Sequence, residues 1–354
     1  MEKKLGLSGP TSIKEYGVAK FNEACRSNVL TFTKEWEQVV TRLGRWVDFE
    51  NDYKTMDVSF MESIWWVFKQ LWEKDLVYQD FRVMPYSWRL STSLSNFEAN
   101  MDYRDVQDPA VTIKMPLSTQ KNSNHALQHL VNDGATLLIW TTTPWTLPSN
   151  LAVAVGEEIV YVVGKKSLPK PKKGQDLTEL PPADENLYIV AKDLATKVLG
   201  KGCEIREEIL GKDLVGLAYE PLFDYFVDQV SEQSYHVIAS THVTTGDGTG
   251  LVHMAPDFGE DDFNACKARG IQVLQSVDDG GNFVSAVRDF AGQNIKEADP
   301  AILRHIKERG RLFKQSTIQH AYPYCWRSGT PLIYRAVPAW FVRVEKGSQC
   351  RTVV

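Results

Sequence analysis

The stretch from residue 136 to residue 155 constrains the fold more than any other part of the sequence. It contains two short apolar runs, Thr136–Ile139 and Leu151–Val155, which have the length of buried strands. Pro144 and Pro148 stand between them and exclude a regular helix interior, because proline lacks a backbone N–H and clashes with the preceding turn. We therefore predict a strand, a rigid loop that displays several threonine hydroxyls in one fixed arrangement, and a second strand.

Short strand-like runs recur along the middle of the chain, at Ile159–Val163, Leu187–Val190 and His236–Ala239. Many short strands separated by glycine turns are typical of a closed barrel or a curled sheet. Helical patterns at Lys192–Leu199 and Ala298–Arg309 accompany these strands. We therefore predict an α+β fold class, with a β-barrel-like domain in the middle of the chain.

The N-terminal part of the chain has helical periodicity instead. Ser12–Arg26 and Thr33–Leu43 carry apolar residues at helical spacing, and Met61–Asp75 carries an aromatic stripe. The stripe consists of Ile64, Trp65, Phe68, Leu71 and Trp72. Such a stripe is typical of a helix face packed in a core, so we predict that it is buried and is not a ligand site. Residues 82–116 are predicted to form short strands and turns.

The composition is that of an ordinary globular protein and argues against several classes of function. Lys plus Arg is 40 and Asp plus Glu is 45, a net charge of −5, which argues against a generally basic nucleic-acid coat. The lysine-rich stretch Lys165–Pro182 is predicted to be a solvated loop, with contact to RNA phosphates as the alternative.

No apolar run approaches the roughly 20 residues that span a membrane, and no apolar stretch follows Met1–Lys4 as in a signal peptide. The five scattered cysteines fit a reducing compartment, so we expect a cytoplasmic protein. We also expect a monomer that does not enter a membrane.

A second informative stretch runs from Gly246 to Phe263 and reads GDGTGLVHMAPDFGEDDF. Its first glycines permit a tight turn, after which a short strand would deliver His253. Gly259 then precedes an amphipathic helix whose first turn contains Asp261 and Asp262. Taken singly, either aspartate is best explained by compensation of the helix dipole, and His253 by satisfied hydrogen bonds within a sheet.

Together the two stretches resemble one known family. The string WTTTPWTLPSN, Trp140–Asn150, is similar to the threonine-rich peptide in the editing domain of isoleucyl-tRNA synthetases, which are class I enzymes. A histidine followed nine residues later by an aspartate resembles the opposite wall of the same pocket. The leucyl and valyl enzymes usually carry an arginine within this peptide, where the present chain has threonine. TRLGRWVDFENDYKTMD and SFMESIWWVFKQLWEK resemble the catalytic-domain segment that precedes the editing domain in the eukaryotic-type branch, which some bacteria also carry.

The resemblance implies a division of the chain into four parts. Residues 1–84 would be a helical segment of the synthetase catalytic domain, 85–116 a β-ribbon connector, 117–320 the editing domain (the connective polypeptide), and 321–354 a return segment towards the catalytic domain. The similarity ends after Glu345, and the role of residues 346–354 stays open.

Many relatives carry a small zinc ribbon at the connector, but this chain lacks the ligands for it. Pro85–Arg89 contains no cysteine, and Cys325–Ser328 has one cysteine where a Cys-x-x-Cys is common. One thiolate cannot build a tetrahedral zinc site, so we predict no structural metal.

The resemblance also implies roles for single residues in hydrolysis. Asp262 would pair with the α-ammonium group of the substrate, and His253 would form the wall against a larger side chain and help to place water. Thr141, Thr142 and Thr143 would bind the terminal adenosine and flank the ester, and Trp145, Thr146 and Asn150 would hold the loop or the ligand. Catalysis is assigned to Asp262, His253, Thr142 and Thr143. No pairing of a serine or cysteine nucleophile with a histidine is apparent in the sequence, so positioned water would attack, and the sequence leaves open which group accepts its proton.

The implied activity is editing, the hydrolysis of valine that has been mischarged onto isoleucine tRNA, without a cofactor. The partners would be the 3′ end of that tRNA, valine and isoleucine moieties, and the rest of the synthetase. The chain contains no His-x-Gly-His and no Lys-Met-Ser-Lys-Ser, so ATP and magnesium would serve the full-length enzyme alone and this chain would not charge tRNA. Two alternatives stay open, a tRNA-end binding module without hydrolysis and an inactive truncated fragment.

Overall fold

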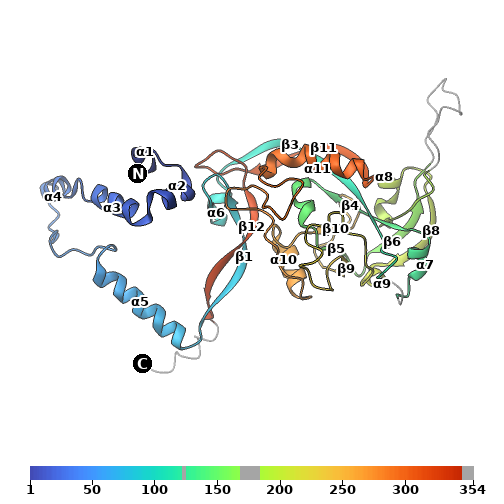
Figure 1. Cartoon of the computed structure of the whole chain (residues 1–354), viewed down its shortest axis with the longest axis horizontal. Helices are drawn as coiled ribbons and strands as arrows, with labels where there is room; N and C mark the ends of the chain where they lie inside the picture. Colours follow the sequence, from blue (N-terminus) through green and yellow to red (C-terminus); the bar gives the residue numbers. More distant parts are fainter. Residues whose placement is uncertain (122–124, 168–183, 345–354) are drawn as a thin grey trace, which may run out of the picture. The chain divides into compact units, whose positions relative to one another are not determined.

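The chain divides at Phe81 and Pro338 into two units. One unit contains Met1–Phe81 together with the chain from Pro338, and the other is Arg82–Val337 (Figure 1). The structure, a computed structural model, describes residues 1–121, 125–167 and 184–344. Most of the lysine-rich stretch and the tail at 346–354 therefore lie outside the described residues. Both sequence motifs fall in the second unit, which positions the candidate site.

Helices make up the first unit as far as Glu73, as the periodicity predicts. They are α1 (Glu2–Leu5), α2 (Gly9–Tyr16), α3 (Val18–Val29), α4 (Thr33–Arg42) and α5 (Val58–Glu73). The predicted burial of the aromatic stripe on α5 is wrong, since Trp65 is 69% and Trp72 is 55% exposed. Within the described residues, the ring of Trp340 contacts Phe68 and Trp72, and the rest of that helix face has no cover.

Strands dominate the rest of the chain and form three sheets. The first joins β12 (Ile333–Val342), β1 (Val77–Ser87) and β2 (Thr92–Ser93). The second joins β10 (Val252–Met254), β5 (Ala152–Val155) and β9 (His236–Ala239). The third has the order β11 (Leu312–Pro323), β3 (Tyr103–Pro116), β4 (Thr136–Thr141), β7 (Leu187–Ala191), β6 (Val160–Lys165) and β8 (Glu204–Leu210). The strands predicted for the middle of the chain are confirmed, but residues 82–116 contain the 14-residue strand β3 where short strands and turns were expected.

The closed barrel is wrong, because the six-stranded sheet is open in the described part of the chain, and the alternative, a curled sheet, stays a prediction. In the described part of the chain its two edge strands, β11 and β8, do not pair with each other. β8 exposes Glu204, Arg206 and Glu208, and β11 exposes the polar run Lys314–Thr317. Charged and polar side chains along an edge discourage further strand pairing, so the sheet ends at these strands. The α+β class itself fits the observed mixture of helices and sheets.

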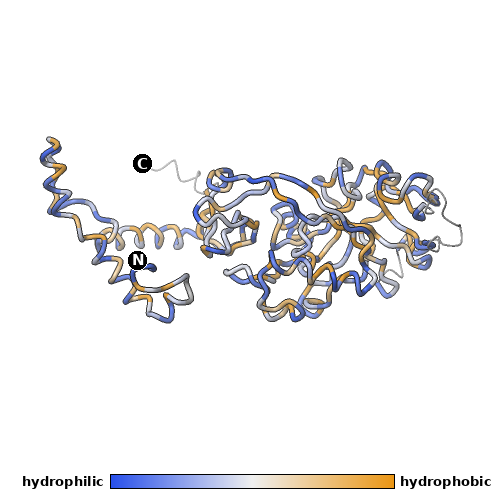
Figure 2. The backbone as a smooth tube through the Cα atoms, turned by 90° about the horizontal axis from the view of Figure 1, so that it is seen from above, coloured by the Kyte–Doolittle hydropathy of each residue, from blue (hydrophilic) through white to orange (hydrophobic). Residues whose placement is uncertain are grey.

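The sheet β10-β5-β9 brings one wall of the candidate site together. β5 is its central strand and is fully buried, paired antiparallel with β10 and parallel with β9. The uninterrupted apolar run Ala152–Val155 fits this position, since a strand covered on both faces has no polar side. The pairing sets His253 opposite Val153. Figure 2 shows orange, apolar stretches of the backbone tube running through the larger unit.

The segment predicted as a rigid loop between β4 and β5 forms a 3₁₀ helix, η1 (Pro144–Ser149). Pro144 takes the first position, where the missing N–H has no helical partner to lose. Pro148 is tolerated because hydrogen bonds donated by the backbone N–H groups of Thr146 and Asn150 lie on either side of it. The prolines therefore exclude an α-helix here but not a short 3₁₀ turn.

Further helices cover the sheets. They are α6 (Asn96–Ala99), α7 (Gln128–Asn132), η3 (Lys192–Leu194), α8 (Ala195–Leu199), α9 (Gly211–Leu214), α10 (Glu260–Lys267) and α11 (Ile295–Glu308). The helices predicted at residues 192–199 and 298–309 are confirmed as η3 with α8 and as α11. Across the described ranges, no helix is long and apolar enough to cross a membrane.

Candidate active site

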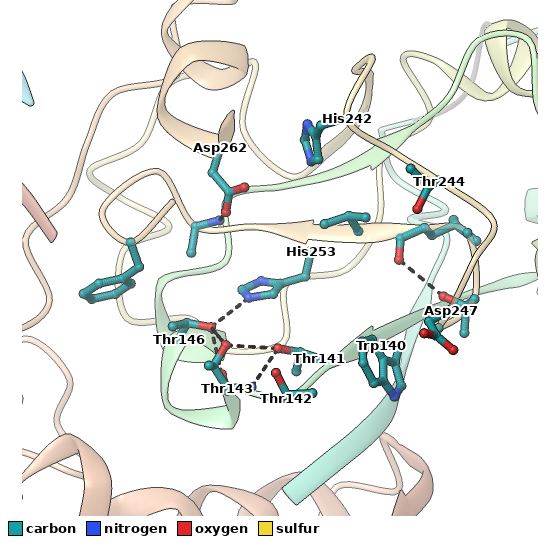
Figure 3. Close-up of a pocket in the computed structure, with 17 residues that line it drawn as sticks. Trp140, Thr141, Thr142, Thr143, Thr146, His242, Thr244, Asp247, His253 and Asp262 are labelled. Atoms are coloured by element: carbon teal, nitrogen blue, oxygen red, sulfur yellow. Dashed lines mark hydrogen bonds between the residues drawn. The ribbon is translucent and has the colours of Figure 1, made fainter. Parts of the chain in front are cut away.

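A cavity of about 370 Å³ lies between the two motif stretches. The end of β4 and the start of η1 form one wall, and β10, the glycine-rich bend before it and the start of α10 form the other (Figure 3). Most of the residues predicted for the site line this cavity, namely Thr141, Thr142, Thr143, Thr146, His253 and Asp262. Stretches far apart in the sequence therefore meet around one space.

The threonines form a chain of hydroxyl groups along one wall. The N–H of Thr143 donates to Thr141 Oγ1 at 3.1 Å, and the two Oγ1 atoms are 3.2 Å apart. Thr146 Oγ1 donates to the carbonyl of Thr143 at 2.8 Å. Such local bonds are typical of threonine side chains next to a turn. Thr142 differs, because it lines the cavity while its hydroxyl makes no hydrogen bond within the described chain, which leaves that hydroxyl for a ligand.

His253 is held as a neutral ring by hydrogen bonds at both of its nitrogens. Asn150 Oδ1 accepts from the Tyr219 hydroxyl at 2.7 Å, so the Asn150 amide nitrogen faces His253 Nδ1, at 3.3 Å, and donates to it. The hydroxyl of Thr146 donates its hydrogen bond to the carbonyl oxygen of Thr143, so Thr146 Oγ1 can only accept from His253. His253 Nε2 therefore carries the hydrogen and donates to Thr146 Oγ1 at 2.8 Å. Burial lowers the pKa of His253 to about 4. Both ring nitrogens are therefore taken up by protein partners, and the expected roles of His253, as a wall and in placing water, stay predictions.

Asp262 points into the cavity from the first turn of α10, whereas its neighbour Asp261 is exposed. Its Oδ2 accepts the N–H of Ala255 at 2.9 Å. The side chain folds back over Gly259, where a Cβ atom would stand 2.8 Å from the carboxyl carbon, so glycine leaves room for this rotamer. Burial raises the pKa of Asp262 to about 6, despite the hydrogen bond from Ala255.

The glycine-rich bend before β10 borders another side of the cavity. Gly248 and Gly250 have φ angles of 74° and 77°, which favour glycine. A Cβ atom on Gly250 would stand 2.3 Å from the Cβ of Ala191, and one on Gly248 would stand 3.2 Å from the ring of Trp140. The bend therefore packs directly on β7 and on Trp140, and this close contact fixes where Asp247 meets the cavity.

The sequence matches the family model described as class I tRNA synthetases (I, L, M and V) over residues 1–352. The chain belongs to the class I tRNA synthetases. It is 50% identical to the isoleucine–tRNA ligase of Bdellovibrio bacteriovorus over 93% of its length. It is 44% and 46% identical to the cytoplasmic isoleucine–tRNA ligases of Arabidopsis thaliana and Saccharomyces cerevisiae, each over 98% of its length. The chain spans 29%, 30% and 30% of these three relatives.

A solved structure with some similarity is the editing domain of the P. knowlesi cytosolic leucyl-tRNA synthetase. It is 14% identical, with a TM-score of 0.41, and the match covers 63% of this chain and 100% of that one.

Two residues predicted for the site do not line the cavity. Trp145 is 3% exposed and packs edge-on against Phe258, with ring centroids 4.7 Å apart. Asn150 is 5% exposed and reaches His253 from the side away from the cavity lining. Both side chains contact residues that do line the cavity, and the expectation that they hold the loop or the ligand stays a prediction.

Sequence reasoning gave no role to Trp140, His242, Thr244 and Asp247, which are among the further residues that line the cavity. Trp140 belongs to the threonine-rich string but received no role there. His242 and Thr244 stand in a polar segment just before the glycine-rich bend, and Asp247 lies within the bend. A polar run at such a turn is the one signal that could have drawn attention to them. His242 has its Nδ1 atom 2.7 Å from Ser240 Oγ, while its Nε2 atom is buried without a partner.

Metal ligands do not gather in the described part of this synthetase chain, where no cluster of three or more His, Cys, Asp or Glu residues could hold an ion. Cys325, the single cysteine of the expected ribbon, packs with Leu94, Ala99 and Leu332 in a small apolar cluster. The absence of structural zinc stays a prediction.

Proposed function

We propose that the cavity hydrolyses the ester that joins valine to the 3′-terminal adenosine of isoleucine tRNA. The observation that carries this proposal is a half-buried carboxylate, Asp262, which faces a wall of threonine hydroxyls across the ring of His253, whose pKa burial lowers to about 4 (Figure 3). The choice of tRNA rests on the relatives, which are isoleucine–tRNA ligases. Because the chain spans about 30% of them, charging of tRNA is not proposed for it.

The need for such a site follows from the small difference between isoleucine and valine. One methylene in an apolar pocket changes binding by only roughly 1–3 kcal/mol, a range for which isoleucine enzymes are themselves a standard example. A second pocket that admits valine and excludes isoleucine adds a further step of discrimination. His253 fits the excluding wall, because bonds to Thr146 and Asn150 fix its ring in one place.

Asp262 supplies the charge that would recognise an aminoacyl group. With a pKa of about 6 it is mostly ionised at neutral pH, and in the described part of the chain no lysine, arginine or histidine forms an ion pair with it. A buried anion without a counter-charge is unfavourable. The α-ammonium group of an aminoacyl ester would supply that counter-charge through a charge-assisted hydrogen bond.

The reaction needs little more than positioning. Water attacks the ester carbonyl carbon, the bond from that carbon to the ribose oxygen breaks, and the proton of the water passes to the released ribose oxygen. An aminoacyl ester is already reactive, so orientation of the carbonyl between Asp262 and Thr142 accounts for much of the acceleration. No cofactor is proposed for this step, and ATP and magnesium remain expectations for a full-length enzyme.

Single-turnover deacylation of valyl- and isoleucyl-tRNA, both on isoleucine tRNA, tests the proposal. We expect fast release of valine and slow release of isoleucine. Equal rates would contradict the size selection, and no release of valine by a folded sample would contradict the activity. Tight binding of the tRNA end without release would instead favour the second reading, a binding module.

The wider setting is proposed from the relatives alone. The two eukaryotic relatives carry the word cytoplasmic in their names, and we propose a cytoplasmic location for this chain as well. The proposed partners are the 3′ end of isoleucine tRNA and the rest of a synthetase. A monomeric state is proposed and is tested by sedimentation.

A further inference from the structure

The cavity has two chemically different ends, joined by β10. Just after β10, Ala255 donates its N–H to Asp262. Just before β10, Gly250 belongs to the bend that carries Asp247. Residues 250 and 255 are five residues apart, a separation of at most about 16 Å at roughly 3.3 Å per extended residue, and Val252–Met254 between them form the strand. Figure 3 likewise shows Asp262 and Asp247 on opposite sides of His253.

A cation stands at the Asp247 end. Lys197 on α8 has its Nζ atom 2.9 Å from Asp247 Oδ1, and the two side chains are 60% and 78% exposed. In the described ranges no other lysine or arginine pairs with a carboxylate that lines the cavity. An exposed pair of this kind contributes little to stability, so Lys197 can exchange Asp247 for another anion at small cost.

The direction of the ligand follows from the proposed function, on which this inference rests. With the α-ammonium group at Asp262, the ester and ribose lie beside His253 and the threonines, and the 5′ side of the terminal adenosine points towards Asp247. The 5′ oxygen of that adenosine carries the phosphate that links it to the preceding nucleotide. This phosphate must leave the cavity past an aspartate, on a chain whose net charge is −5.

We propose that Lys197 binds the last internucleotide phosphate of the tRNA 3′ end and releases Asp247 when it does so. Lysine binds phosphate as a point charge, and each such contact releases counterions from the nucleic acid. Asp247 competes with the phosphate for Lys197 and keeps the ammonium group over the mouth of the cavity in the free protein.

The test measures binding, so that it does not depend on turnover. The probe is isoleucine tRNA that carries valine through a hydrolysis-resistant 3′-amide, titrated at several salt concentrations. We expect Lys197→Gln to raise Kd about three- to tenfold and to reduce the slope of log Kd against log salt by about 0.7, the value for one single-strand phosphate contact. Asp247→Asn should lower Kd, because it removes the competing anion and its repulsion.

A phosphate contact predicts that Kd rises in Lys197→Gln and falls in Asp247→Asn. A purely structural ion pair predicts that Kd rises in both variants, because each of them loses the pair. Lys192→Gln is the matched control, because Lys192 also forms an exposed ion pair, with Glu208 at 2.7 Å, but Glu208 does not line the cavity, whereas Asp247 does. Valyl-adenosine, which has no phosphate, should bind all variants equally. An unchanged Kd in Lys197→Gln, or a raised Kd in both Lys197→Gln and Asp247→Asn, would overturn the inference, whereas loss of hydrolysis with normal binding would overturn the proposed function alone.

Discussion

Asp261 and Asp262 are adjacent in the sequence, but Asp261 is exposed to solvent and Asp262 lines the cavity. Both lie in the first turn of α10, where an acidic side chain stabilises the helix by about 0.3–1 kcal/mol, yet Asp262 alone faces the cavity. We expect Asp262→Ala to slow the hydrolysis of valyl-tRNA at least about tenfold, because a charged hydrogen bond contributes about 1.5–3 kcal/mol. Asp261→Ala should keep the rate and lose a little stability. Single-turnover kinetics and melting curves compare the two, and the reverse result would move the ligand contact to Asp261.

The raised pKa of Asp262 predicts opposite effects of pH on activity and stability. Its pKa is about 6 in the folded chain against an ordinary value of 3.8, so the folded state holds the proton more tightly than the unfolded state. The charged carboxylate therefore costs stability above pH 6, and this cost disappears as the pH falls from 6 to 3.8. Binding of an ammonium group needs the charged form, so kcat/KM should fall below about pH 6.

The variant Asp262→Asn isolates this titration from those of other buried acids, such as Asp257 and Asp299, whose pKa values burial raises to about 7. At pH 8 we expect Asp262→Asn to be more stable than the parent by about 1–3 kcal/mol, and the difference should vanish near pH 4. Denaturant unfolding at a series of pH values gives the difference. A parent chain that is the more stable of the two at pH 8 would show that Asp262 is not strained by burial.

Some of this detail could be predicted from the sequence. Successive helical residues point about 100° apart, so the step from Gly259 to Asp262 fixes which aspartate can face inwards. The placement of Trp145 and Asn150 could not be predicted, because it depends on the 3₁₀ turn that the prolines adopt. Trp140 was missed for another reason, since its contact with Gly248 joins segments far apart in the sequence.

At the scale of elements, the bend before β10 is the part most sensitive to a single methyl group. A Cβ atom at Gly250 would meet Ala191 at 2.3 Å in a backbone conformation with φ of 77°, whereas one at Gly246 would meet nothing within 4 Å. We expect Gly250→Ala to lower the free energy of unfolding by about 1–3 kcal/mol and to slow hydrolysis, because the bend sets the start of the strand that carries His253. Gly246→Ala should change stability by less than about 0.5 kcal/mol. Equal losses in the two variants, measured by denaturant unfolding, would contradict this account.

Some strands could be predicted from sequence patterns, and others could not. β5, β7 and β10 have short apolar runs that the sequence identifies directly, because they are buried on both faces or nearly so. β3 was missed, since its first half is exposed and polar and its regularity comes from pairing with β11 along eleven residues. Closure into a barrel depends on whether edge strands pair, and the alternation within single strands does not determine that.

Across the whole molecule, burial is distributed unevenly. Every buried hydrophobic residue of the described chain lies between Val77 and Ala336, although the helices before Val77 carry apolar faces. Periodicity correctly predicted these helices, because spacing determines which face is apolar. It could not predict their exposure, because burial requires a second surface that covers the face.

The difference in burial between the helices before Val77 and the strands of the core predicts two rates of amide hydrogen exchange within one chain. α3 and α4 contain 12 and 10 residues and bury none of them, and isolated helices of that length are marginal in water. We expect their amides to exchange hydrogen within seconds, while those of β4 and β5 exchange only through global opening. Hydrogen exchange followed by mass spectrometry should be run at several protein concentrations, since self-association through the exposed face of α5 would protect that helix in a concentration-dependent way. Strong protection of α3 and α4 at the lowest concentration would show that these helices are stabilised within the single chain and would contradict the prediction.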